Sequence, residues 1–161
     1  MTDILMSIRP PYVDMIVSGC KTVEIRKRAV RAPVGSQIWI YATSPRQKVV
    51  ASARLEAVVL DAPDKIWRAF GDRAGISRRE FDAYVGNAEV VAALRLTEIM
   101  ALDEPLCPRG ETPTFRPPQS YAFLHDVGLL AALEARACSE RSVDPTATTR
   151  RSDQPTSRLS T

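Results

Sequence analysis

The chain has 161 residues, of which 45% are hydrophobic and 25% charged, and its formal net charge is +3. These values are close to those of an average globular protein, and they exclude collagen, coiled-coil and wholly disordered classes. The length suits one domain with a hydrophobic core of its own.

The sequence indicates neither a membrane span nor a metal centre. No stretch approaches the roughly 18 apolar residues of a membrane helix, and the first residues lack the pattern of a secretion signal. The cysteines (Cys20, Cys107 and Cys138) are widely spaced, and His125 is the only histidine. This pattern fits neither a disulfide framework nor a zinc site, so we expect a cytoplasmic protein without a cofactor.

Positive charge is concentrated in residues 20–54, which contain eight basic residues against Glu24 alone, a net of +7. The rest of the chain therefore carries −4. Such a basic region indicates an anionic partner for one face of the protein. The alternative is a solvated strand edge on which Lys and Arg discourage aggregation. The basic residues are Lys21, Arg26, Lys27, Arg28, Arg31, Arg46, Lys48 and Arg54.

The first part of the chain predicts four strands and one helix. Residues 4–9 read as a strand, and residues 10–18 as a helix, because a Pro-Pro pair opens this segment and a glycine follows it. Residues 22–28 alternate between apolar and polar, which predicts a half-buried strand with a polar outer face. Residues 37–42 are apolar on both faces and predict a central strand, and residues 49–60 predict the next one.

The second part predicts two helices, two strands and a final helix. Residues 66–70 supply the buried face of the first helix, and a capping box at Ser77 and Glu80 starts the second. Residues 88–100 predict a long strand, residues 121–124 a short one and residues 128–137 the last helix. This order does not alternate as a parallel βαβ sheet would, so we expect a mixed, partly closed barrel with helices at its ends.

The composition changes after residue 135. Residues 136–161 include ten Ser or Thr and two Pro, with Val143 and Leu159 as the large aliphatic residues. Such a segment cannot bury enough apolar surface to offset its ordering entropy. We therefore expect one domain over residues 1–135 and a disordered tail over residues 136–161.

Four stretches together resemble the ASCH domain, a PUA-like family named after activating signal cointegrator homology, and the resemblance spans residues 3 to about 125. The stretches are Ser7-Ile8-Arg9-Pro10, Gly19-Cys20-Lys21-Thr22-Val23-Glu24-Ile25-Arg26-Lys27-Arg28, Ile40-Tyr41-Ala42-Thr43-Ser44-Pro45 and Pro117-Pro118-Gln119-Ser120-Tyr121. The resemblance implies an α+β fold, a PUA-like mixed β pseudobarrel with a cleft between its first helix and the barrel. It also implies action on RNA or nucleotides.

Some members of the family are enzymes, either ribonucleases or amidohydrolases that remove the acetyl group from acetylated cytidine. The amidohydrolase branch carries a Lys-Thr-x-Thr-x-Arg pattern and a Glu further along the chain. Lys21, Thr22 and Arg26 match this pattern, whereas Glu24 replaces the second Thr. The downstream region reads Arg73-Ala74-Gly75, so its Glu is missing, and Asp72 and Glu80 are the nearest carboxylates.

We predict that a cleft binds RNA, a nucleotide or a nucleoside. Arginine suits phosphate recognition and stacking on bases, tyrosine suits stacking, and Ser and Gln suit hydrogen bonds to phosphate or base edges. The predicted binding residues are Arg9, Lys21, Glu24, Arg26, Tyr41, Ser44, Gln119 and Ser120.

Two alternatives remain open. If the chain is an enzyme, either a nucleoside amidohydrolase or a ribonuclease, Lys21 and Glu24 are the predicted catalytic acid–base pair. Three positions apart on a strand, they would nominally leave on opposite faces, and they converge only if the chain twists or bulges just after Gly19. The third reading is a protein-interaction module whose basic face meets an acidic partner.

Overall fold

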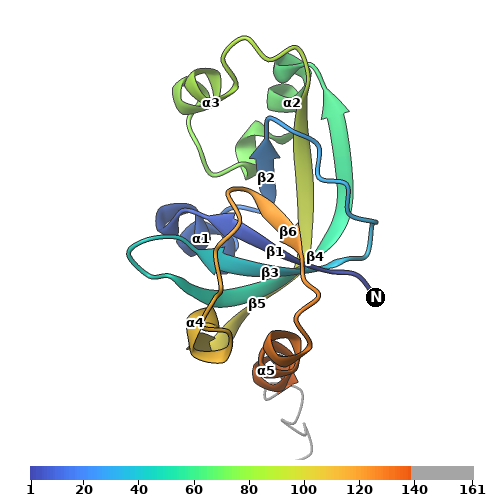
Figure 1. The fold of residues 1–161 in the computed structure, drawn as a ribbon. Helices are drawn as coiled ribbons and strands as arrows, with labels where there is room; N and C mark the ends of the chain where they lie inside the picture. The colour runs from blue at the N-terminus through green and yellow to red at the C-terminus, as the bar shows by residue number, and fades with distance from the viewer. Residues whose placement is uncertain (139–161) are drawn as a thin grey trace, which may run out of the picture.

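The computed structural model describes residues 1–138, in which six strands form one curled sheet with helices at both ends (Figure 1). The strands are β1 (Asp3–Ile8), β2 (Val23–Arg26), β3 (Gln37–Ala42), β4 (Lys48–Asp61), β5 (Val91–Leu106) and β6 (Tyr121–Phe123). The helices are α1 (Pro10–Val17), α2 (Pro63–Phe70), the 3₁₀ turn η1 (Gly71–Arg73), α3 (Arg78–Val85), α4 (Pro108–Glu111) and α5 (Val127–Cys138).

The sheet has the order β2-β5-β4-β3-β1-β6, so β2 and β6 are its two edges. All neighbours pair antiparallel except β1 and β3, which are parallel. The register of β4 shifts three times against β5 and once against β3. Such irregularities bend a strand and increase its twist, which is how the sheet curls.

Helices cap the curled sheet at two ends. Figure 1 shows α2 and α3 together beside β2, and α4 and α5 together at the opposite end of the molecule. Helix α1 follows β1 directly and begins at the Pro-Pro pair, and Gly19 beyond its end has a φ of +81°. The Pro-Pro pair and Gly19 therefore mark the two ends of α1, as predicted from the sequence.

The alternation of strand residues distributes the core over three hydrophobic clusters. Ile4 of β1 and Ile16 of α1 belong to the first, inside the curled sheet. Trp39 of β3 packs with Leu129 of α5 in the second, and Phe81 of α3 belongs to the third. The central position of residues 37–42 is confirmed, because β3 lies between β4 and β1 and its faces contribute to two clusters.

The capping box at the start of α3 is also confirmed. The Glu80 amide donates to the Ser77 hydroxyl oxygen over 3.2 Å, and the Ser77 amide donates to the Glu80 carboxylate over 2.7 Å. These two bonds satisfy amide groups that a helix start would otherwise leave free.

Some boundaries differ from the prediction. Strand β2 ends at Arg26 rather than residue 28, and β5 continues to Leu106 because its second half pairs with the start of β4. Helix α5 runs to Cys138, three residues beyond the predicted domain boundary. The remainder of the predicted tail, residues 139–161, lies outside the described residues.

Candidate functional site

Three charged side chains, from β2 and the residues just before it, come together in a buried cluster. Lys21 Nζ lies 3.0 Å from one carboxylate oxygen of Glu24, and Arg26 Nε lies 3.2 Å from the other. Lys21 is 2% exposed and Glu24 is 8% exposed. Charged groups are buried in this way only where partners compensate for the lost hydration. Lys21 lies before the regular strand begins, so the alternation of side chains between the two faces of a strand does not apply to it. This is why Lys21 and Glu24 can converge.

The Lys21 ammonium is fully engaged by protein acceptors. Its Nζ donates to the carbonyl of Val23 over 2.9 Å and to the carbonyl of Ala74, in addition to its pairing with Glu24. These three acceptors match the three N–H donors of an ammonium group. Lys21 therefore joins the start of β2 to the segment after η1, and Nζ also lies 5.6 Å from the centroid of the Tyr12 ring on α1.

Arg26 connects β2 with segments at the other edge of the sheet. Its terminal nitrogens donate to the Ser7 carbonyl over 3.0 Å and to the Ser120 hydroxyl over 3.3 Å. Ser7 lies in β1 and its hydroxyl donates to the Pro118 carbonyl over 2.6 Å. Because β2 and β6 are the edges of the sheet, the contacts of Arg26 with Ser7 and with Ser120 close the pseudobarrel.

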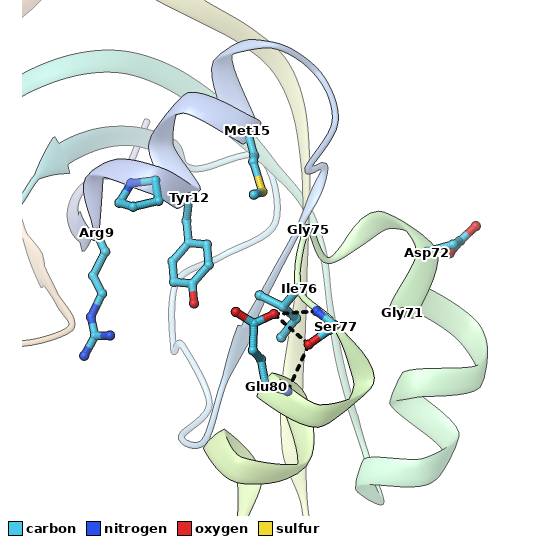
Figure 2. A pocket seen from close by; sticks show the side chains of 10 residues that line it. Arg9, Tyr12, Met15, Gly71, Asp72, Gly75, Ile76, Ser77 and Glu80 are labelled. Atoms are coloured by element: carbon cyan, nitrogen blue, oxygen red, sulfur yellow. Dashed lines mark hydrogen bonds between the residues drawn. The ribbon is translucent and has the colours of Figure 1, made fainter.

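A pocket of about 760 Å³ lies beside this cluster, between α1 and the start of α3. Figure 2 shows Arg9, Tyr12 and Met15 on one side, and Ser77 and Glu80 on the other. The Asp72 side chain points away from the pocket in this view. Hydrogen bonds from the amide and the hydroxyl of Ser77 hold the pKa of Glu80 below its usual value, so this carboxylate is negatively charged near neutral pH.

Among the described residues, Arg9 is the only basic residue that lines this pocket, but further cations without carboxylate partners lie along the loop after β2. Within residues 1–138, Lys27, Arg28 and Arg31 have no carboxylate partner, and neither does Arg9. The loop is fixed at two points, because the Lys27 amide donates to the Tyr84 hydroxyl of α3 and the Arg31 amide to the Tyr121 hydroxyl of β6.

Most other cations of the basic segment have acidic partners. Arg46 makes two hydrogen bonds to Asp14, over 2.7 and 2.9 Å, and Arg54 pairs with Glu98 over 2.9 Å. The net of +7 in the sequence therefore overstates the positive charge that this segment presents to a partner.

The structure brings some of the predicted site residues together and separates others. Lys21, Glu24, Arg26 and Ser120 share the cluster, Gln119 is exposed beside it, and Arg9 lines the pocket. Tyr41 lies elsewhere.

Tyr41 is 3% exposed in the second core cluster, where its ring contacts Phe115 at a centroid distance of 5.7 Å. Burial raises the pKa of Tyr41. Ser44 is exposed in the turn after β3. Neither residue lines the pocket between α1 and α3.

Several residues at this site were not predicted from the sequence to belong to it. Tyr12 and Met15 carry no motif, and only the packing of α1 against the segment after η1 brings them to the pocket. Ser77 and Glu80 were identified as a helix cap, which is a local signal that says nothing about a neighbouring cavity. Ser7 was part of the ASCH-like stretch, but its bond to Pro118 joins residues 111 positions apart.

Residues 1–138 contain neither a metal-binding cluster nor a membrane-spanning helix. No group of three or more His, Cys, Asp or Glu side chains is placed to hold a metal ion in this part of the chain. No helix in the same range is long and apolar enough to cross a membrane.

Comparisons with known proteins identify relatives of this chain. Residues 1–114 match the family model described as Domain of unknown function (DUF365). A protein of Zymomonas mobilis subsp. mobilis, named ASCH domain-containing ribonuclease, is 33% identical over 136 residues, covering 77% of this chain and 89% of that protein.

Solved structures agree with this relationship. The crystal structure of ASCH from Zymomonas mobilis superposes with a TM-score of 0.76 at 30% identity, covering 82% of this chain and 94% of that one. A Tyr-to-Phe variant of that protein gives 0.78 at 29% identity, over 84% and 98% of the two chains. The PUA-like pseudobarrel predicted from the sequence is therefore confirmed. This chain belongs to the ASCH domain family.

Proposed function

We propose that this protein binds single-stranded RNA across the pocket between α1 and α3 and along the adjoining loop of residues 27–31. The observation that carries the proposal is a set of cations beside an aromatic side chain, none of which has a carboxylate partner within residues 1–138. Arg9 and Tyr12 line the pocket, and Lys27, Arg28 and Arg31 extend from it along the fixed loop. The 33% identical relative named as a ribonuclease supports RNA as the anionic partner.

The chemistry of these side chains suits a nucleic-acid strand. Guanidinium groups bind phosphate with directed hydrogen bonds, and exposed aromatic rings stack on bases that a single strand leaves unpaired. Gln119 and Ser120 would contact base edges or phosphate from the loop before β6, as the sequence analysis predicts. The Lys21–Glu24–Arg26 cluster would support this surface from below rather than meet the ligand, since its charges are already paired.

RNA cleavage is a second candidate function, and the name of the Zymomonas mobilis relative favours it. The predicted catalytic pair, Lys21 and Glu24, is in contact, but the three N–H donors of the Lys21 ammonium are already bonded to protein acceptors, so none is left for a substrate. For the same reason we expect little turnover of acetylated cytidine. A catalytic role for Lys21 would require one of these acceptors to be displaced when substrate binds.

The binding proposal is tested by fluorescence anisotropy with a labelled oligouridine of about twelve nucleotides, a length within the range of single-strand binding sites. We expect affinity to fall with salt, by about 0.7 logarithmic units per tenfold salt increase for each phosphate contact. The variant Arg28→Ala/Arg31→Ala should bind about tenfold more weakly and show a shallower salt dependence. Arg68→Ala is the matched control and should bind like the wild type, because it removes an exposed Arg of α2 that makes no ion pair within residues 1–138.

Absence of RNA binding by the wild type at low salt would refute the proposal, and so would equal binding by the loop variant and the control. The same labelled RNA, followed on a denaturing gel, tests cleavage. Shortened products that disappear in both Lys21→Met and Glu24→Gln would establish the ribonuclease function and assign the acid–base roles to this pair.

A further inference from the structure

A second pocket lies beside α4. Figure 1 shows α4 at the opposite end of the molecule from α2 and α3. Its volume is about 340 Å³, and it is formed by α4 and the loop that follows this helix. The lining residues are Arg109, Pro113, Thr114, Phe115 and Arg116. Two arginines and one aromatic ring around a small cavity are the side chains that a nucleotide requires, because phosphate needs cations and a base needs a flat apolar face.

The positive charge of this pocket is not neutralised by the part of the protein that the structure describes. Arg109 and Arg116 are both exposed, and neither makes an ion pair within residues 1–138. Glu111, the acidic residue of α4, pairs with neither of them. Both guanidinium groups are thus available to an anion from solution.

Phe115 is held in place from several directions. Its ring lies against Tyr41 with the two planes inclined at 52°, and its amide donates to the Thr112 carbonyl over 2.9 Å. The Thr112 hydroxyl in turn donates to the Asp126 carboxylate over 2.7 Å, just before α5. The half-buried ring is therefore fixed before any ligand arrives, which lowers the entropic cost of stacking on it.

The same loop continues to the charged cluster beside the first pocket. Phe115 and Arg116 are followed by Pro117 and Pro118, and then by Gln119 and Ser120. The Ser7 hydroxyl fixes the Pro118 carbonyl, and Arg26 contacts the Ser120 hydroxyl. Five residues of a proline-rich segment span at most about 15 Å, a distance that a few nucleotides can cover.

We propose that Arg109, Phe115 and Arg116 form a second nucleotide subsite, in which the arginines bind phosphate and the phenyl ring stacks on a base. This subsite extends the RNA strand from the pocket between α1 and α3 along the loop before β6, so the inference rests on the proposed RNA binding. A strand that reaches both pockets is held more tightly than either pocket could hold it, because the second contact is intramolecular.

The test compares three proteins on the oligouridine of about twelve nucleotides: wild type, Arg109→Ala/Arg116→Ala and Arg68→Ala. We expect the double variant to bind about tenfold more weakly and to lose about 1.4 logarithmic units of salt dependence, equivalent to two phosphate contacts. Arg68→Ala should match the wild type. Phe115→Leu keeps an apolar side chain against Tyr41 but removes the stacking face, and it should weaken binding at least roughly fivefold.

The outcomes separate the two proposals. If the wild type binds and Arg28→Ala/Arg31→Ala weakens binding while Arg109→Ala/Arg116→Ala matches Arg68→Ala, the subsite is refuted and the first site stands. If the wild type binds no RNA, both are refuted. The exposed arginines can be replaced without disturbing the core, so the double variant decides the question even if Phe115→Leu proves unstable.

Discussion

Arg26 is a structural connector in a position where the sequence indicates a ligand-binding residue. It contacts Glu24 in its own strand, the Ser7 carbonyl in β1 and the Ser120 hydroxyl before β6. Its side chain is 12% exposed, so solvent screens these contacts weakly. The arginine thereby holds two edges of the sheet that no backbone hydrogen-bond ladder joins.

Replacement of Arg26 should therefore lower stability. We expect Arg26→Met to reduce the free energy of unfolding by about 2 kcal/mol, because it removes hydrogen bonds to a charged group and leaves Glu24 with Lys21 alone. Urea denaturation measures this change. The control is Arg95→Met, which breaks the exposed pair with Glu56 and should cost about 0.5 kcal/mol or less. Equal losses in the two variants would contradict the connecting role of Arg26.

At the scale of the element, α5 depends on the carboxylate that precedes it. Asp126 accepts hydrogen bonds from the Leu129 amide and from the Thr112 hydroxyl, and these bonds lower its pKa from 3.8. A carboxylate whose pKa is lower in the folded state stabilises the fold above its unfolded pKa. That stabilisation is lost as the pH falls through the lowered value. Asp126 thus links the start of α5 to the loop that carries Phe115 in a pH-dependent manner.

This linkage can be measured by thermal unfolding between neutral pH and pH values below 3.8. The wild type should lose stability as the pH falls, and Asp126→Asn should lose less, because an amide keeps the acceptor oxygen but does not titrate. Part of the wild-type pH dependence should remain in Asp126→Asn, because the pKa values of Glu80 and Asp14 are also lowered in the folded protein. An unchanged slope in Asp126→Asn would show that this cap contributes nothing to the acid sensitivity.

At the scale of the whole molecule, Gly75 marks the point where three segments converge. Its φ is +67°, and a Cβ there would lie 3.0 Å from both the Cβ of Lys21 and the sulfur of Met15. A side chain at this position therefore meets backbone strain and the close approach of α1 and the start of β2. The connection between α2 and α3 can cover the buried Lys21 only because this residue has no side chain.

We expect Gly75→Ala to reduce the free energy of unfolding by about 2 kcal/mol, through strain and overpacking together. Gly110→Ala is the matched control, because no heavy atom lies within 4 Å of a Cβ placed there and its φ is not in the left-handed region. In α4 this change should be neutral or stabilise by up to about 1 kcal/mol. Chemical denaturation of both variants checks the difference, and the prediction is wrong if the two shift in the same direction by the same amount.

Elements with strong local signals can be predicted from the sequence. The Pro-Pro pair and Gly19 delimit α1, the Ser77–Glu80 box starts α3, and the apolar run of residues 37–42 is the central strand β3. Each of these signals acts over a few neighbouring residues, through φ preferences, capping bonds or burial on both faces. The short elements η1 and α4 escaped prediction because three or four residues show no periodicity.

Which charged side chains are buried, and which have ion-pair partners, follows only from the tertiary structure. The alternation of residues 22–28 predicted a polar outer face, but Glu24 is buried and Arg26 is nearly so, because the sheet curls and brings β1 and the loop before β6 against that face. Partners far along the chain also neutralise Arg46 and Arg54, whereas Arg9 and the basic residues of the loop after β2 have no carboxylate partner within residues 1–138. The strength of an ion pair depends on the distance between its charges in space, and the exposure of a strand face depends on the segments that cover it. Neither can be read from the spacing of residues along the chain.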